Sequence, residues 1–361
     1  MSSFVFTSES VAEGHPDKVC DYVSDSILDA HLAQDPHARV ACETLVKDGQ
    51  LVLAGEITSR ATVDHVAVAR QAVREVGYVD ADEPFHADGI TVTEFLSRQA
   101  QEIAQGVDVG GAGDQGIMFG YATDETPELM PLPILLAHRL SRQIAEDRRA
   151  GRVQWLRPDA KTQVSVQYVN GRPCAVRTLL VSAQHRASVT HGEIEAYVRE
   201  DLAPRVLGDW FRSDTELLVN PTGGFVQGGP SADAGVTGRK IIVDTYGGMG
   251  RHGGGAFSGK DPTKVDRSGA YFCRWVARQV VREGLAGRCE VQVGYAIGRA
   301  EPVSVRVETY GTGDASRAES FVRTFDFRPD AIIERFDLRR PIYRSTTNYG
   351  HFGREGLPWE E

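Results

Sequence analysis

A glycine-rich stretch with interleaved basic residues runs from Asp244 to Arg267, and it is the part of the sequence best suited to hold a phosphorylated ligand. Seven of the thirteen residues from Gly247 to Gly259, which we call the glycine loop, are glycine. Backbone N–H groups of glycine can approach an anion closely because no Cβ stands in the way. The basic side chains that we expect to add positive charge are Arg251, Lys260, Lys264 and Arg267.

The glycine loop matches the P-loop pattern G-x-x-x-x-G-K-[ST] only in part. Gly254, Gly259 and Lys260 fit the pattern, but Asp261 stands where the pattern has the hydroxyl that holds Mg²⁺. We therefore expect an anion site that is not a P-loop. The alternative is a flexible glycine loop that only joins two elements, and the interleaved basic residues argue against it.

The elements on either side of the glycine loop must position it. Residues 240–243 form an apolar, β-branched run that predicts a strand. Asp261 and Pro262 are typical of the N-cap and first position of a helix, which we expect to run to about Gly284. A strand, a glycine loop and a helix N-terminus together form a phosphate-binding arrangement. The buried face of that helix is predicted at Val265, Phe272, Val276 and Val280.

The overall charge disfavours nucleic acid as a partner. The 361 residues carry a formal net charge of -10, whereas residues 239–267 hold six basic and three acidic side chains, a local charge of +3. That contrast favours a small, highly charged anion as ligand. We recognise no membrane span and no signal peptide. The five cysteines form no C-x-x-C pair, so we expect a cytoplasmic protein without disulfides or a zinc site.

His15 and Asp17 flank Pro16, which predicts the start of a helix. Side chains at such a junction between loop and helix can point into a cleft. The alternative is that Asp17 complements the helix dipole and His15 fills a turn. The local sequence does not decide between the two.

Two acidic residues are predicted on one face of a hairpin. Residues 39–46 and 50–57 alternate like strands, and Asp48-Gly49 is typical of a type I′ turn. A two-residue loop places Glu43 opposite Ala54, so Glu56 lies diagonal to Glu43 at roughly 7–8 Å. This pair could form a cation or ammonium site, or it could be part of a solvated sheet face.

Paired strands followed by a helix occur three times in the sequence. The strand pairs are expected near residues 39–57, 161–182 and 289–310, about 120 residues apart. This spacing predicts an α+β protein of three similar α/β subdomains, each with helices on one face of its sheet. The repeat is one of pattern rather than of sequence identity.

With these residues in view, the chain resembles the S-adenosylmethionine synthetase (methionine adenosyltransferase) family. The hexapeptide Gly111–Gly116 and the nonapeptide Gly253–Asp261 are highly specific to that family. The matching stretches follow one order from residue 4 to residue 359, and further ones are Phe6–Val11, Gly14–Lys18, Ala41–Thr44, Gly55–Thr58, Trp155–Lys161 and Thr237–Lys240.

The resemblance implies a fold, an assembly and a reaction. The three subdomains would be related by pseudo-threefold symmetry and span residues 1–100, 111–231 and 232–361. The chain would form a homodimer or homotetramer with active sites at the dimer interface. The methionine sulfur would attack C5′ of ATP, and the tripolyphosphate would then be hydrolysed to phosphate and pyrophosphate. Mg²⁺ and K⁺ are the implied cofactors.

The resemblance also implies the role of individual residues. Those with a catalytic role would be His15, Asp114, Lys161, Arg239 and Lys260. Nucleotide contacts would come from His15, Asp159, Lys161, Gly224, Phe225, Asp233, Arg239, Lys240, Ala256 and Lys260. Methionine contacts would come from Glu56, Gln99, Asp233 and Lys264. The metal ligands would be Asp17 and Asp266 for Mg²⁺ and Glu43 for K⁺.

The sequence departs from the family pattern at three places. Gly224 stands where the family commonly has arginine, and Ala232 replaces a usual glycine. The segment Gln105–Gly110, part of the active-site lid at about residues 101–110, reaches the hexapeptide about five residues sooner than in typical bacterial members. We expect this shorter lid to be open without ligand and to close over bound ATP and methionine.

Two other functions remain open from the sequence. A kinase-like phosphotransferase would also use the glycine loop, and it would release ADP. A non-catalytic regulatory partner would keep the nucleotide fold but lose residues such as His15, Asp17 or Lys260, and all three are present.

Overall fold

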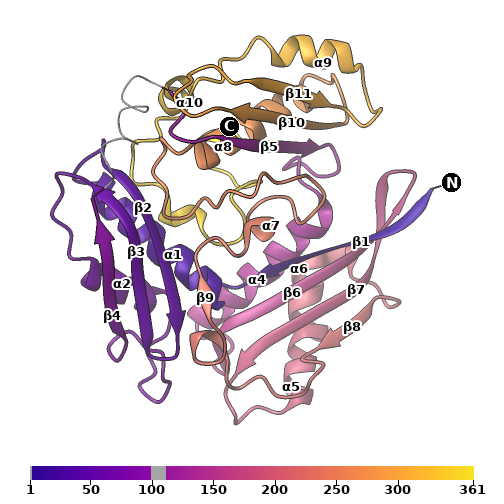
Figure 1. Ribbon diagram of the computed structural model, residues 1–361. Coiled ribbons are helices and arrows are strands. Elements are labelled where there is room, and N and C mark those ends of the chain that lie inside the picture. Colours follow the sequence, from indigo (N-terminus) through magenta and orange to yellow (C-terminus); the bar gives the residue numbers. More distant parts are fainter. Residues whose placement is uncertain (1, 99–110) are drawn as a thin grey trace.

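Three β-sheets surround the centre of the molecule, and each has helices packed against its inner face (Figure 1). The computed structural model describes residues 2–98 and 111–361. The predicted α+β class with three similar subdomains is confirmed.

The first sheet has the strand order β4-β3-β2-β9. Strand β2 pairs antiparallel with β3 and β9, whereas β3 and β4 are parallel. The long helix α1 packs on β2 and on α2. The elements are α1 (Pro16–Leu32), β2 (Arg39–Lys47), β3 (Gln50–Thr58), α2 (His65–Val76), β4 (Thr91–Ser97) and β9 (Gly235–Val236).

The second sheet has the order β1-β6-β7-β8 and is covered mainly by α4. Its central hairpin, β6 and β7, is the longest in the molecule's described part. The elements are β1 (Ser3–Val11), α4 (Leu132–Arg149), β6 (Leu156–Val169), β7 (Arg172–His185), α5 (His191–Ala196), a π-helical turn (Tyr197–Leu202), α6 (Ala203–Leu207), a 3-10 turn (Gly208–Trp210) and β8 (Glu216–Val219).

The third sheet has the order β11-β10-β5, and α8 packs against β5 and β10. The elements are β5 (Gly116–Thr123), α8 (Val265–Arg282), β10 (Arg288–Tyr295), β11 (Ser304–Glu308), α9 (Ala315–Val322) and α10 (Pro329–Phe336). Shorter elements of the carboxyl half are a 3-10 turn (Gly229–Ser231), α7 (Ile241–Asp244) and the 3-10 turns Arg344–Thr346 and Pro358–Glu360.

Each sheet includes one strand that comes from a distant part of the chain. The N-terminal strand β1 pairs with β6 of the second sheet, β5 pairs with β10 of the third, and β9 pairs with β2 of the first. These exchanges bind the three subdomains together. They also bring the N-terminus of α1, the start of β6 and the segment after β9 to one place.

Two predicted helices are confirmed, and local sequence explains both. Pro16 occupies the first turn of α1, where its missing N–H costs no hydrogen bond. Helix α8 ends at Arg282, close to the predicted end. Its predicted apolar face is buried, with Val265, Phe272, Val276 and Val280 each at most 2% exposed.

The predicted strand at residues 240–243 is wrong, because Ile241–Asp244 forms the helical turn α7. The β-branched composition favours a strand, but a tertiary contact overrides it. Asp244 Oδ1 accepts a hydrogen bond from the buried Lys18 Nζ at 2.6 Å. Burial alone would lower the pKa of Lys18, but Asp21 and Asp244 outweigh it and raise that pKa. The lysine therefore stays charged and fixes the turn.

The predicted helix start at Asp261 is also wrong, since α8 begins at Val265 with Lys264 as N-cap. Asp261 is used elsewhere: its carboxylate accepts the Val40 N–H of β2 at 2.7 Å and the Thr263 N–H at 3.0 Å. The side chain that looked like a helix cap thus ties the end of the glycine loop to the first sheet.

The hairpin β2-β3 has the predicted register, with Lys47 opposite Gln50 and Glu43 opposite Ala54. Its turn differs from type I′. Asp48 has a φ of 49°, but Gly49 is not among the residues with positive φ, and type I′ needs both. Within the described part of the chain, no helix is both long and apolar enough to cross a lipid bilayer.

Candidate active site

His15 and Asp17 are buried together at the N-terminus of α1. The Asp17 N–H donates to His15 Nδ1 at 3.1 Å, so a neutral His15 carries its proton on Nε2. Burial, and then the positive charge of Lys240, lowers the pKa of His15 to about 2. His15 is therefore a neutral hydrogen-bond donor at any physiological pH.

Asp17 holds the end of β9 and the residues that follow it against the start of α1. Its Oδ2 accepts from Lys240 Nζ at 2.6 Å, and its Oδ1 accepts the Val236 N–H at 3.1 Å. Arg239 lies 3.7 Å from the same carboxylate and is 54% exposed. One exposed and one half-buried cation, Arg239 and Lys240, thus stand beside Asp17 at the N-terminus of α1.

Asp159, at the start of β6, is a buried carboxylate with an unused oxygen. Its Oδ2 accepts the Gly229 N–H at 2.9 Å, whereas its Oδ1 has no hydrogen-bond partner among the described residues. Burial raises the pKa of Asp159 to about 6, although Lys161 opposes the rise. A buried, unpaired acceptor costs stability, so it marks a place where a ligand donor fits.

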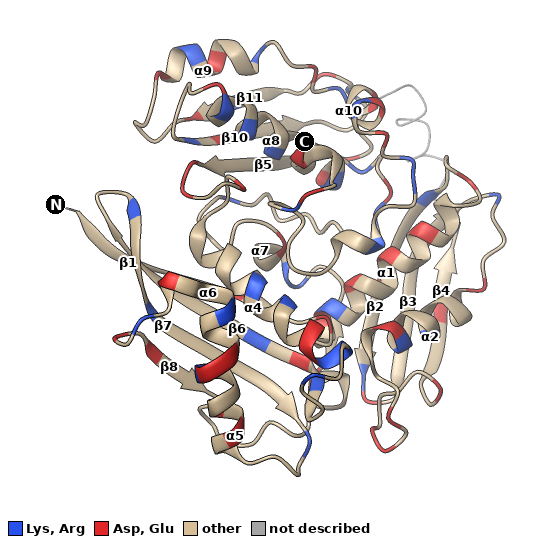
Figure 2. Cartoon of the chain, turned by 180° about the vertical axis from the view of Figure 1, so that it is seen from behind, with Lys and Arg blue, Asp and Glu red and all other residues tan. Residues whose placement is uncertain are grey.

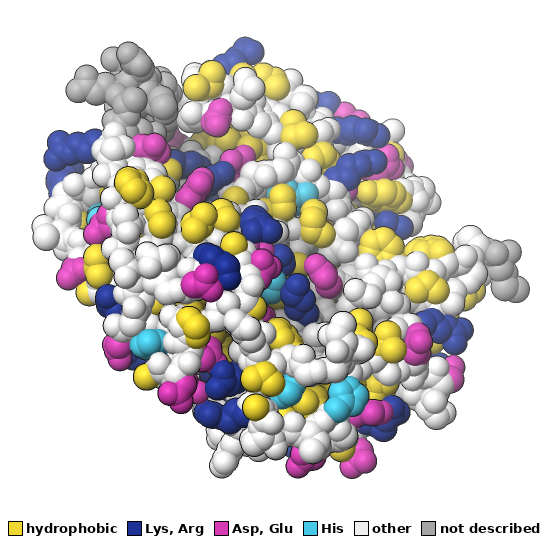
Figure 3. Space-filling view, turned by 60° about the horizontal axis from the view of Figure 1, so that its bottom comes forward, with side chains coloured by type: hydrophobic (Ala, Val, Ile, Leu, Met, Phe, Trp, Pro, Cys, Tyr) yellow, Lys and Arg dark blue, Asp and Glu magenta, His cyan; other side chains and the backbone are white. Residues whose placement is uncertain are grey.

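Lys161 and Asp233 border this carboxylate. The charge of Lys161 lowers the pKa of both His15 and Asp159, and the charge of Asp233 raises the pKa of Asp159, so both residues lie near the Asp159 carboxylate. Figure 3 shows basic and acidic side chains gathered near the middle of one face, with hydrophobic side chains beside them. We call the following set the α1 cluster: His15, Asp17, Asp159, Lys161, Asp233, Arg239 and Lys240.

The segment 224–229 contacts the α1 cluster at its end, where the Gly229 N–H donates to Asp159. Phe225 is half-buried, and its N–H donates to His185 Nε2 at 2.9 Å. A Cβ built on Gly224 meets nothing within 4 Å. There is thus open space where the family commonly places an arginine.

A second group of charges lies at the end of the glycine loop. Lys260 Nζ is 2.6 Å from Asp266 Oδ2, and Lys264 pairs with Asp261. The Asp266 side chain lies against Gly255, where a Cβ would be 2.3 Å from Asp266 Cγ and would force that side chain to move. We call Lys260, Lys264 and Asp266 the glycine-loop cluster. Ala256 lies next to it against Gly238, whose Cβ, if built, would be 2.4 Å from that of Ala256.

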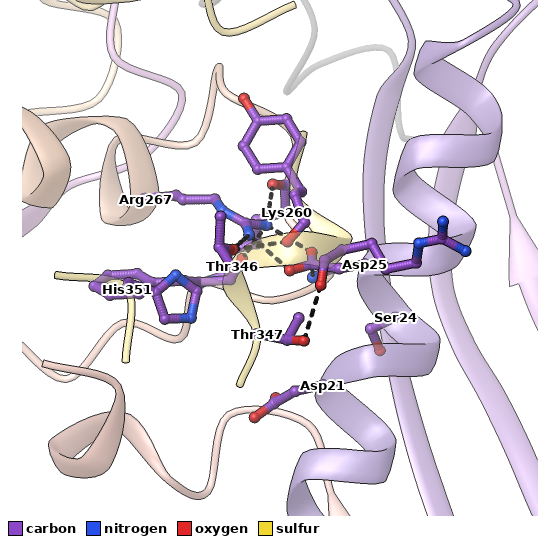
Figure 4. A network of polar contacts seen from close by, with 12 residues as sticks. Asp21, Ser24, Asp25, Lys260, Arg267, Thr346, Thr347 and His351 are labelled. Atoms are coloured by element: carbon purple, nitrogen blue, oxygen red, sulfur yellow. Dashed lines mark hydrogen bonds and ion pairs between the residues drawn. The ribbon is translucent and has the colours of Figure 1, made fainter. Parts of the chain in front are cut away.

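Arg267 does not belong to the cationic lining, which corrects the sequence-based expectation. Its side chain is 0% exposed and forms a bidentate pair with Asp25 of α1, with both N···O distances 2.7 Å (Figure 4). The guanidinium also donates to the backbone oxygens of Phe257 and Lys260. Arg267 thus holds the glycine loop and cannot reach a ligand.

Arg251 is likewise held by a protein partner, because its guanidinium and its N–H both donate to the Glu290 carboxylate of β10.

The partner of Arg267 that sequence reasoning missed is Asp25. A signal for it exists: Asp21, Asp25 and Asp29 recur every four residues along α1, and acidic residues do follow that helix in Figure 2. A buried acidic stripe requires basic partners from other elements.

Glu43 and Glu56 share one face of the first sheet, as the register predicts, and both are exposed. Asp114 is exposed as well and accepts its neighbour's N–H, that of Gln115, at 2.7 Å. Among the residues that the structure describes, no hydrogen bond or ion pair joins these side chains to either cluster. Gln99 and the lid segment 101–110 lie outside the described residues.

Comparison with known proteins gives matches along almost the whole chain. Three family models of S-adenosylmethionine synthetase match in order: the N-terminal domain over residues 3–101, the central domain over 109–225 and the C-terminal domain over 227–361.

Curated relatives match over almost the whole chain. The S-adenosylmethionine synthase of Akkermansia muciniphila is 54% identical over 373 residues, covering 99% of this chain and 95% of the relative. Those of Sorangium cellulosum and Desulforudis audaxviator are each 55% identical, covering 100% of this chain and 88% and 96% of the relatives. The chain therefore belongs to the S-adenosylmethionine synthetase family.

Proposed function

We propose that the chain makes S-adenosylmethionine from ATP and L-methionine, by attack of the methionine sulfur on C5′ of ATP, and then hydrolyses the tripolyphosphate to phosphate and pyrophosphate. The observation that carries this proposal is the α1 cluster. It combines a buried Asp159 oxygen that has no partner in the described part of the chain, and is suited to a ribose hydroxyl, with a neutral His15 and the cations Lys161 and Lys240.

The chemistry of the reaction suits a cluster of this kind. A thioether sulfur has no proton to lose, so its attack on C5′ needs no general base. What it needs is alignment of sulfur, C5′ and the leaving oxygen, which can be worth roughly 7–11 kcal/mol. It also needs stabilisation of the negative charge that collects on the departing triphosphate.

His15 would donate a hydrogen bond from Nε2 to the leaving oxygen. Burial, together with the positive charge of Lys240, lowers its pKa and so favours the neutral donor form. Four basic side chains would balance the negative charge of the triphosphate: Lys161, Arg239, Lys240 and Lys260. The rest of the nucleotide would be lined by Phe225, Asp233 and Ala256. Gly224 would leave that part of the nucleotide without the usual arginine.

Mg²⁺ is expected at Asp17 and Asp266. Within residues 2–98 and 111–361, no group of three or more His, Cys, Asp or Glu side chains could hold a metal ion by itself. Asp17 and Asp266 are single carboxylates, each beside a lysine. Mg²⁺ often binds through one or two carboxylates together with substrate phosphates, and this donor set fits that mode. Bound there, Mg²⁺ would offset charge on the triphosphate.

Further assignments rest on the family resemblance alone. Glu43, on the open sheet face, would hold K⁺. Methionine would be bound by Glu56, Gln99, Asp233 and Lys264, with Asp114 lining its pocket.

We also propose that a complete site forms between two copies of the chain. The outer face of the first sheet carries Leu45 and Phe95, 42% and 67% exposed, and Phe95 is in register with Ala54 and Glu43 across the sheet. Exposed apolar side chains grouped in this way are typical of an interface. In such a dimer the α1 cluster of one copy would face the glycine-loop cluster of the other.

The dimer proposal predicts complementation between two inactive variants. Lys161→Ala and Lys260→Ala should each slow product formation by about 10–150-fold, since each removes a charge-assisted hydrogen bond. When the two variants are co-expressed, mixed dimers contain one intact site, so about a quarter of wild-type activity should return. A mixture no more active than its parents would mean that both lysines serve a site within one chain.

The reaction itself is tested by product analysis. Purified protein is incubated with ATP, methionine, Mg²⁺ and K⁺, and the products are identified by mass. We expect S-adenosylmethionine with one phosphate and one pyrophosphate per turnover. Release of ADP would favour a phosphotransferase instead, and the absence of any product from folded dimer would refute the proposal.

A further inference from the structure

Residues 224–229 have little order of their own. Four of the seven residues from Gly223 to Gly229 are glycine, and Gly223 and Gly229 have φ values of 98° and 59°. A segment of this composition samples many conformations, so its shape must come from contacts with its surroundings. Asp159 of β6 holds Gly229, and two further side chains that contact the segment come from the end of β7.

Gln184 joins this segment to the start of β6. The side chain is fully buried, and its Nε2 donates to the Val226 oxygen at 3.1 Å while its Oε1 accepts the Asp159 N–H at 3.2 Å. A Cβ built on Gly228 would lie 2.8 Å from both the Gln184 side chain and the Phe225 ring. Val226, Asp159 and the Phe225 ring are thus held around one amide.

His185 fixes the backbone of Phe225 on both sides. The His185 N–H donates to the Phe225 oxygen at 3.0 Å, and the Phe225 N–H donates to His185 Nε2 at 2.9 Å. The other ring nitrogen, Nδ1, lies 2.9 Å from the Arg186 oxygen. Because that carbonyl can only accept, Nδ1 carries the proton and Nε2 keeps the lone pair that receives the Phe225 N–H.

We propose that Gln184 and His185 are positioning residues for nucleotide recognition. They hold Phe225 and Val226 beside Asp159, the buried carboxylate of the α1 cluster. This inference rests on the proposed function, because it takes the α1 cluster to bind ATP. The two residues touch the segment rather than the substrate. Their loss should therefore weaken ATP binding and leave the chemical step nearly unchanged, as expected for an interaction equally strong in ground and transition states.

Three variants of His185 separate positioning from general packing. Glutamine can place an acceptor oxygen where Nε2 stands, asparagine reaches only the position of Nδ1, and leucine offers neither. We expect His185→Leu and His185→Asn to raise the KM for ATP by about 5–100-fold, because the half-buried Phe225 N–H loses its acceptor. His185→Gln should stay within about threefold of wild type, and kcat should change little in all three. The matched control is His37→Asn, at an exposed histidine between α1 and β2.

Two further measurements make the outcome unambiguous. Hydrogen exchange over residues 224–229 should speed up in the leucine and asparagine variants and not in the glutamine variant. The dissociation constant for ATP, measured without methionine, should follow the same order. If wild-type protein forms no S-adenosylmethionine, the proposed function fails, while ATP affinity and exchange still decide the positioning role. Equal KM for ATP in all variants, or a loss of kcat that glutamine does not rescue, would overturn it.

Discussion

Replacing Arg267 with methionine is expected to lower the free energy of unfolding by about 3–5 kcal/mol. The guanidinium is fully buried, and its departure would leave the Asp25 carboxylate buried without its counter-charge. It also donates to Tyr271 and Thr346, so α1, α8 and the C-terminal segment all meet at this side chain (Figure 4). Urea unfolding followed by circular dichroism measures the change.

The matched control is Arg172→Met, which breaks an Arg–Asp pair at the surface. Arg172 and its partner Asp124 are 61% and 40% exposed, so the expected loss is at most about 1 kcal/mol. The double variant Asp25→Leu/Arg267→Met removes both buried charges and should recover much of the loss. If Arg267→Met unfolds no more easily than Arg172→Met, the pair does not hold the subdomains together.

The elements that the sequence predicts well are those with local causes. The helix at Pro16 follows from a proline whose geometry suits the first turn, and the register of β2 and β3 follows from a two-residue loop at Asp48. Part of the α1 cluster could be predicted from the sequence for the same reason. His15 and Asp17 flank a predicted helix start, and that junction places them beside each other.

The elements that sequence reasoning missed depend on distant partners. Strand β4 pairs parallel with β3, and β5 joins the third sheet beside β10, more than 160 residues later in the chain. No turn signal encodes either pairing. The run at 240–243 becomes helical because Asp244 meets Lys18, and Arg267 leaves the anion site because Asp25 is opposite it. Local composition does not reveal such pairings.

Two positioning side chains, Gln184 and His185, carry no sequence signal of function by themselves. They lie at the end of a strand, and their role becomes visible only once the 224–229 segment folds back onto them. Gly224 and Phe225 are predicted nucleotide contacts on the family resemblance alone. The side chains that hold these two residues in place could be identified only from the structure.

Asp159→Asn is expected to stabilise the folded chain while weakening its hold on ATP. Burial raises the pKa of Asp159 from 3.8 to about 6, against the opposing charge of Lys161. Between those two values the folded chain binds more protons than the unfolded chain, so stability falls as pH rises through this window. Above about pH 6 the ionised carboxylate carries the full cost, which is up to about 3 kcal/mol.

Asparagine removes that cost and keeps an oxygen to accept the Gly229 N–H. The variant should therefore unfold at higher urea than wild type at pH 8, with the difference vanishing near pH 4. It also replaces the unpaired acceptor oxygen with an amide donor, so a ribose hydroxyl would lose its partner and the ATP dissociation constant should rise roughly tenfold or more. Asp159→Ala serves as control, because it leaves the Gly229 N–H unpaired and should lose stability as well as affinity. A variant Asp159→Asn that binds ATP as wild type does, or that is less stable at pH 8, would show that this buried carboxylate is retained for folding rather than for the nucleotide.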